Sequence, residues 1–163
     1  PELRGAVTYH RAMAVELQER FDEVDELYER AASLDPEYCP RPVRMGEDEA
    51  RDMLRGLVQS FPSDVRAVLD NATIEIVEVP DRKVDWTPHG GPLLLGLYLG
   101  VPIGERDQMS VGMPERVRIF KRNIERVASD LAELREQLRL TLLHEVGHHL
   151  GWDEDDLAER GLA

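Results

Sequence analysis

The apolar periodicity between Asp130 and Leu150 is the sequence feature that most constrains the fold. Leucine and valine recur there at steps of three and four residues, at positions Leu131, Leu134, Leu138, Leu142 and Val146. This spacing places apolar side chains on one face of an α-helix. The segment therefore predicts one long helix whose apolar stripe belongs to the core.

Three shorter segments before this helix have the composition of β-strands. Residues 73–79 mix β-branched and acidic residues with a period near two, and residues 93–99 are an apolar run bounded by Gly-Pro and Gly. Residues 116–120 alternate arginine with valine, isoleucine and phenylalanine. Helical patterns cover residues 47–60 and a shorter piece that ends near Leu69. Helices, about three strands and a long helix, in that order, predict an α+β fold.

The first 42 residues predict a helical hairpin and a linker. Apolar residues recur at helical spacing from Gly5 to Leu34, and charged residues around Phe21 mark a turn between two short helices. Asp35-Pro36 ends the second helix, because the residue before a proline avoids the α conformation. Two further prolines stiffen the segment that follows. We expect a hairpin with its linker over residues 1–42 and a second domain over residues 43–163.

The second helix of this hairpin resembles that of a tetratricopeptide repeat. The resemblance rests on Glu23, Tyr28, Ala31 and the sequence Leu34-Asp35-Pro36. A single repeat cannot bury its own apolar face, so the hairpin must pack on the rest of the chain, on another copy or on further repeats. The resemblance implies a protein partner for the hairpin.

Length, charge and cysteine content exclude several classes of protein. A chain of 163 residues corresponds to about one domain and needs no structural metal, so a bound metal is expected to perform chemistry. The net charge of −13 opposes binding to nucleic acid and to anionic membranes. The single Cys39 excludes an internal disulfide, and residues 93–100 are too short for a membrane span. We expect a soluble, cytoplasmic protein without nucleic-acid or membrane partners.

The sequence His144-Glu145-Val146-Gly147-His148 is an H-E-x-x-H motif at the end of the long helix. A step of four residues returns almost to the starting direction of a helix, so both imidazoles can bind one Zn²⁺. Zinc lowers the pKa of a bound water toward about 7, and Glu145 is placed to accept its proton and return it to the leaving amine. The motif predicts a zinc-dependent hydrolase with Glu145 as general base.

A catalytic zinc site generally has a third protein ligand. Gly151 can adopt a positive φ that ends the helix and turns the chain back toward the metal. Ten residues after the first histidine lies Glu154, which this spacing favours as the third ligand. Asp153 is the alternative, although it is better suited to cap a last short helix over residues 154–160, with Asp156 at the third helical position.

A family resemblance rests on three segments together, residues 94–102 followed by Glu105-Arg106, residues 113–120 and residues 144–151. With them, the chain from about Glu47 to Ala163 resembles the minimal zincin-like metallopeptidases, small bacterial proteins with the motif H-E-x-G-H-x-x-G-x-x-D. The resemblance implies a small mixed sheet packed on the active-site helix and a zinc peptidase acting on peptides or proteins. At the third-ligand position the family usually has aspartate, where this chain has Glu154.

Several other residues near the motif have both a functional and a structural interpretation. Tyr98 is a candidate transition-state stabiliser or an ordinary strand aromatic, while His89 and Arg106 either reach the site or lie on the surface. We expect His149 to be structural and to face the leucine stripe. Gly147 costs its helix about 1 kcal/mol relative to alanine, which predicts close approach of a strand or substrate.

Two other functions remain open at this point. One is a non-catalytic metal-binding adaptor that uses the repeat-like hairpin. The other is a zinc hydrolase of a non-peptide substrate, since Gly151-Trp152-Asp153 matches the centre of the H-x-x-x-H-x-x-G-x-D-H motif of bacterial endoribonucleases that mature ribosomal RNA. Three features argue against an RNA substrate. They are the net charge, the presence of Glu145, and Glu154 at the position where those endoribonucleases have their third histidine. A zinc-dependent peptidase is the function we expect first.

Overall fold

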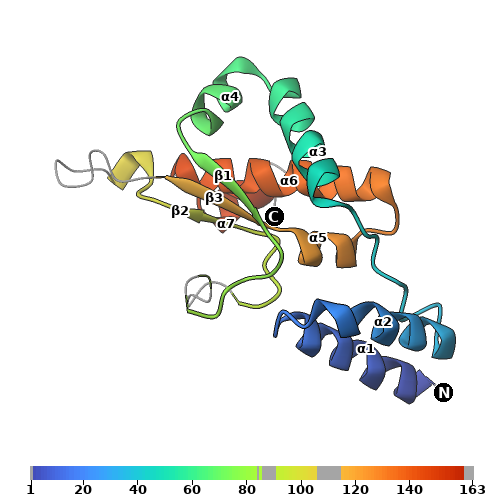
Figure 1. Ribbon diagram of the computed structural model, residues 1–163. Coiled ribbons are helices and arrows are strands. Elements are labelled where there is room, and N and C mark those ends of the chain that lie inside the picture. The colour runs from blue at the N-terminus through green and yellow to red at the C-terminus, as the bar shows by residue number, and fades with distance from the viewer. Residues whose placement is uncertain (1, 84, 86–90, 106–114, 160–163) are drawn as a thin grey trace.

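The computed structural model describes residues 2–83, 85, 91–105 and 115–159 and has the predicted α+β class (Figure 1). The candidates His89 and Arg106 lie outside these residues. In chain order the elements are α1 (Glu2–Glu16), α2 (Phe21–Leu34), α3 (Glu47–Ser60), α4 (Ser63–Leu69), β1 (Thr73–Val77), β2 (Gly96–Leu99), the 3₁₀ turn η1 (Ile103–Glu105), β3 (Arg116–Phe120), α5 (Lys121–Val127), α6 (Leu131–His149) and α7 (Glu154–Glu159).

The three strands form one mixed sheet in the order β1-β3-β2. Strand β1 is parallel to β3 and pairs Ile74 with Val117, whereas β2 is antiparallel and pairs Tyr98 with the same Val117. Because side chains alternate along a strand, these three residues share one face of the sheet. That face belongs to the main hydrophobic core and packs on α6 (Figure 1).

Helix α6 supplies the other half of this core. Four of the five predicted stripe residues are buried, namely Leu134, Leu138, Leu142 and Val146, but Leu131 is 46% exposed. The difference arises because a helical side chain leans toward the N-terminus, so the first residue of a helix projects beyond its end. The start of α6 is the predicted one, since the Asp130 carboxylate accepts a hydrogen bond from the N–H of Glu133 at 2.8 Å.

Helix α5 follows β3 directly and has no counterpart among the sequence-based predictions. Three of its four buried residues, Lys121, Asn123 and Glu125, are polar, and Ile124 alone joins the hydrophobic core, so the helix shows no apolar periodicity. The Asn123 amide donates to the carbonyls of Pro92 and Leu94 at 2.9 and 2.6 Å. The helix is held by specific hydrogen bonds to a distant loop, which a pattern of apolar residues does not reveal.

The predicted N-terminal hairpin is present as α1 and α2, which enclose a small core of their own. It lies beside α5 in Figure 1 and packs on the rest of the chain, one of the three arrangements expected for a lone repeat. The contact is centred on Glu16, which is 0% exposed. Its carboxylate accepts hydrogen bonds from Arg126 at 2.7 Å, Arg44 at 3.0 Å and the Tyr28 hydroxyl at 3.0 Å. Charge pairing therefore joins the hairpin to the second region.

Replacing Glu16 with glutamine should lower the free energy of unfolding by about 3–5 kcal/mol, because Arg44 and Arg126 would lose a buried counter-charge. Urea denaturation measures the change. The control is Glu23→Gln, which breaks an exposed pair with Arg20 and should cost less than about 1 kcal/mol. Similar small changes in both variants would show that the hairpin does not depend on this charge.

Candidate functional site

The last turns of α6 bring the two motif histidines together. The Nε2 atoms of His144 and His148 are 2.9 Å apart, with the rings inclined by 79°. At this distance at most one of the two nitrogens carries a hydrogen, so a lone pair is directed into the space between the rings.

The chain turns back after α6 as the sequence predicts. Gly151 has a φ of +82°, a value that favours glycine. The N–H of Trp152 donates to the Gly147 carbonyl and that of Gly151 to the His148 carbonyl, both at 3.0 Å. This is the Schellman arrangement, and it directs the following residues toward the end of α6.

The turn places Glu154 beside the histidines and Asp153 at the start of α7. Glu154 Oε1 lies 3.6 Å from His148 Nε2, and the ligand atoms of His144, His148 and Glu154 all lie within 4.8 Å of one another. The Asp153 carboxylate accepts from the N–H of Asp156 at 2.9 Å, and the Asp156 carboxylate accepts from the N–H of Asp153 at 3.2 Å. This reciprocal cap stabilises α7 and so fixes the position from which Glu154 extends.

The ring of His148 is oriented by the returning chain. Burial and the neighbouring His144 lower its pKa, against the opposing effects of Glu154 and of a hydrogen bond to the backbone of Trp152. A lowered pKa favours the neutral imidazole, which is the form that binds metals. The role of Trp152 was not predicted, because the only signal in the sequence is its position after Gly151.

Glu145 lies on the buried side of α6 and is 4% exposed. Burial raises its pKa to about 7, although the nearby His144 and a hydrogen bond from the backbone N–H of Tyr98 act in the opposite direction. The hydrogen bond from Tyr98 joins the carboxylate to strand β2. Glu145 is thus held between α6 and the sheet.

A pocket of about 450 Å³ connects these residues with β2, and it is lined by Leu94, Gly96, Leu97, Tyr98, Leu99, His144, Glu145, His148 and Glu154. Among the described strands, β2 has β3 as its one neighbour. The N–H of Phe120 donates to the Leu95 carbonyl at 2.9 Å, so alternation along the strand turns the N–H and C=O of Gly96 and Tyr98 toward the free edge. The pocket therefore combines backbone hydrogen-bonding groups, apolar side chains, two carboxylates and two imidazoles.

The Tyr98 side chain lines the pocket, while its hydroxyl contacts the residues behind it. The hydroxyl donates to the Val101 carbonyl at 3.3 Å and lies 3.2 Å from Nδ1 of His149. The same Nδ1 is 3.1 Å from Glu115 Oε2. His149 is buried, as expected for a structural residue, and its polar contacts are with Tyr98 and Glu115.

The absence of a side chain at Gly147 makes room for Leu157 and Trp152, and not for the predicted strand or substrate. A Cβ atom at this position would collide with Cδ2 of Leu157 and lie 2.9 Å from Cε3 of Trp152. Leu157 is fully buried in α7, so it has little room to move. The close approach is made by the chain that returns after Gly151, and the prediction of a strand or substrate at this point was wrong.

The three donor atoms fit a zinc ion. Two imidazole nitrogens and one carboxylate oxygen are a known donor set of catalytic zinc, and tetrahedral ligands at 2.0–2.1 Å from the metal lie about 3.4 Å apart. Two of the three separations, 2.9 Å between the histidines and 3.6 Å between His148 and Glu154, differ from that value by a few tenths of an ångström, and the third, between His144 and Glu154, is no longer than 4.8 Å. Within the described part of the chain three such donors meet, and a four-coordinate zinc ion held by them would keep one position for solvent or substrate.

Substituting alanine for Gly147 should destabilise the protein by about 1–3 kcal/mol, because the added methyl group overpacks the contact with Leu157. The matched control is Gly56→Ala in α3. A Cβ atom at this position would have no neighbour within 4 Å, so alanine should raise the free energy of unfolding by about 0.5–1 kcal/mol. Thermal and urea unfolding measure both changes. If both variants gained stability, the proposed contact between α6 and α7 would be incorrect.

Comparison with known proteins assigns the chain to a family. A family model described as zincin-like metallopeptidase matches residues 69–162, which is more than half of the chain and includes the sheet, α6 and α7. No curated protein matches the chain. Among the described helices, none has both the length and the apolar character needed to cross a membrane. The match over this span shows that the chain belongs to the zincin-like metallopeptidase family.

Proposed function

We propose that this protein is a zinc-dependent peptidase in which His144, His148 and Glu154 hold one Zn²⁺ and Glu145 is the general base. The observation that carries the proposal is the convergence of three donor atoms within 4.8 Å, next to a buried carboxylate and a free strand edge. Membership of a metallopeptidase family supports hydrolysis of peptide bonds.

Glu145 performs the proton transfers of the proposed reaction. When bound, zinc lowers the pKa of a water toward about 7 and polarises the substrate carbonyl. The Glu145 carboxylate accepts a proton from the attacking water, and the water oxygen forms a bond to the carbonyl carbon. The same carboxyl group then gives the proton to the amine nitrogen as the C–N bond breaks. Its hydrogen bond from Tyr98 keeps the side chain directed toward β2.

Strand β2 holds the substrate in this proposal. The Tyr98 N–H is donated to Glu145, so the outward groups that can pair with an extended peptide are the N–H of Gly96 and the C=O groups of Gly96 and Tyr98, as at other sheet edges that bind peptides. Leu97 and Leu99 offer apolar contacts to its side chains. The Tyr98 hydroxyl stays a candidate transition-state stabiliser, a role that requires it to leave its contacts with Val101 at 3.3 Å and His149 at 3.2 Å.

The variant Glu145→Gln should lose peptide hydrolysis by about 10²-fold or more while its zinc content stays at the wild-type level. A peptide-library digest measures hydrolysis and elemental analysis measures zinc. The control is Glu136→Gln on the exposed side of the same helix, which should keep both properties. Equal turnover by Glu145→Gln would exclude Glu145 as the base. Zinc binding by the wild type without cleavage of any peptide would favour the adaptor function.

The variant Glu154→Gln should bind zinc at least about 100-fold more weakly, because it removes a charged ligand. Competition with a chromogenic chelator measures the affinity. Asp155→Asn removes the same charge from the next residue, which is outside the group of converging donors, and should change the affinity little. An equal effect of both substitutions would mean that only the local negative charge matters and that Glu154 is not a ligand.

A further inference from the structure

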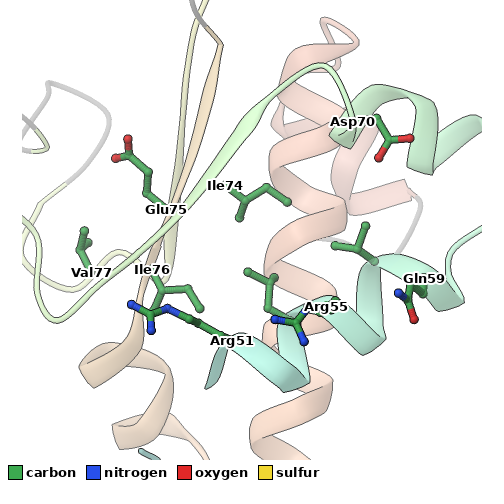
Figure 2. Close-up of a pocket in the computed structure, with 10 residues that line it drawn as sticks. Arg51, Arg55, Gln59, Asp70, Ile74, Glu75, Ile76 and Val77 are labelled. Atoms are coloured by element: carbon green, nitrogen blue, oxygen red, sulfur yellow. The ribbon is translucent and has the colours of Figure 1, made fainter. Parts of the chain in front are cut away.

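A second hollow lies at the opposite edge of the sheet, between α3 and β1. It has a volume of about 800 Å³ and is lined by Arg51, Leu54, Arg55, Val58, Gln59, Asp70, Ile74, Glu75, Ile76 and Val77 (Figure 2). None of these residues belongs to the candidate zinc site, which borders β2. We call this hollow the α3–β1 groove.

One wall of the α3–β1 groove is a free strand edge. In the part of the sheet that the structure describes, β1 has β3 as its one neighbour. The N–H of Thr73 donates to the Glu115 carbonyl at 2.9 Å, so Thr73 and every second residue after it turn their backbone groups toward β3. Ile74 and Ile76 therefore direct their N–H and C=O groups away from β3. Such an edge is a template for an added strand.

The groove also offers apolar surface for the side chains of that strand. Leu54 and Val58 from α3, with Ile74 and Ile76 from β1, are only partly buried. A strand of five residues spans about 17 Å, so the free edge of β1 suits an extended segment of similar length. The hollow between α3 and the edge of β1 has room for a single extended chain. In a second copy of this protein, α3 would also lie beside β1, so the two copies could not pair along their β1 edges.

Two arginines determine which segment fits the groove. Arg51 and Arg55 project from α3 toward it, and their partners are the α3 residues Glu47, Asp48 and Asp52 (Figure 2). All five side chains are more than half exposed, and such pairs contribute about 1 kcal/mol or less. A carboxylate of an incoming segment can therefore replace them at small cost. Although the net charge of the chain is −13, these two arginines offer local positive charge to an acidic segment.

The acidic residues of the groove do not cancel this preference. Glu75 is on the opposite face of the sheet, where it pairs with Arg118 of β3 at 3.4 Å, and Figure 2 shows its carboxylate directed away from α3. Asp70 lies with Gln59 at the end of the groove away from Arg51 (Figure 2). The two guanidinium groups thus lie away from Asp70, and their positive charge becomes available when a ligand carboxylate replaces their pairs within α3.

We propose that the α3–β1 groove binds an extended segment of another protein, aliphatic along its length and acidic at one end. The segment adds to β1 as a further strand through the backbone groups of Ile74 and Ile76. Its aliphatic side chains lie on Leu54 and Val58, and its carboxylates lie beside the arginines of α3. Because β1 and β2 are opposite edges of the sheet, this binding does not depend on the proposed hydrolysis.

The first test measures the affinity of two fluorescein-labelled peptides that alternate threonine with valine and carry two glutamates at the C-terminal or the N-terminal end. Two probes are needed because a strand can add in either direction. Glu145→Gln serves as the parent protein so that neither probe is cleaved. We expect one probe to bind, and Arg51→Glu with Arg55→Glu to weaken it by about tenfold or more.

The matched control carries the same change of charge at exposed arginines outside the groove, Arg30→Glu in α2 with Arg135→Glu in α6. This double variant should bind the probe as the parent does. A probe with lysine in place of glutamate should bind at least about tenfold more weakly. Failure of both acidic probes to bind, or equal losses in the two double variants, would overturn the proposal.

The second test distinguishes strand addition from attraction by charge alone. Amide hydrogen exchange at Ile74 and Ile76 should slow by about tenfold or more when the probe is saturating, because these N–H groups become hydrogen-bonded. Two further probes carry N-methyl groups on the odd-numbered or on the even-numbered residues. One should lose binding, because its methyl groups replace the N–H groups that pair with β1, and the other should bind as the unmethylated probe does. Unchanged exchange at both isoleucines, or equal binding of both methylated probes, would contradict pairing with β1.

Discussion

The packing of α7 against the last turns of α6 is the contact on which the candidate site depends. Gly147 has no side chain, so Leu157 and Trp152 can lie directly against the helix. The positive φ of Gly151 reverses the chain, and the reciprocal cap between Asp153 and Asp156 starts α7 in the required direction. Without this return, Glu154 would not lie beside the two imidazoles of α6.

The small sheet has two free edges among the described strands, and their surroundings differ. At β2, the Tyr98 N–H meets the buried carboxylate of Glu145, and the edge borders the pocket with the two histidines. At β1, the edge faces α3 and its exposed arginines. Free edges usually pair with other chains unless they are protected. We propose a different extended segment for each edge because the charge and chemistry of the two edges differ.

Buried charge, rather than a shared apolar surface, joins the N-terminal hairpin to the remainder of the chain. Glu16 lies among Arg44, Arg126 and Tyr28, and the two regions have separate hydrophobic clusters. Such a network requires each charge to meet its partner in good geometry, since an unpaired buried charge is strongly unfavourable. The arrangement therefore specifies one relative orientation more strictly than apolar contact would.

The sequence by itself determined the long helix, the spacing of His144 and His148, the turn at Gly151 and the cap at Asp153, because each depends on residues a few positions apart. Tertiary structure decided the rest. Helix α5 was missed because most of its buried residues are polar and its hydrogen bonds reach Pro92 and Leu94, far away in the chain. The neighbour of Gly147 and the contact of Tyr98 with Glu145 likewise join separate segments. Local spacing predicts which residues share one face of a helix, but only packing decides what lies against that face.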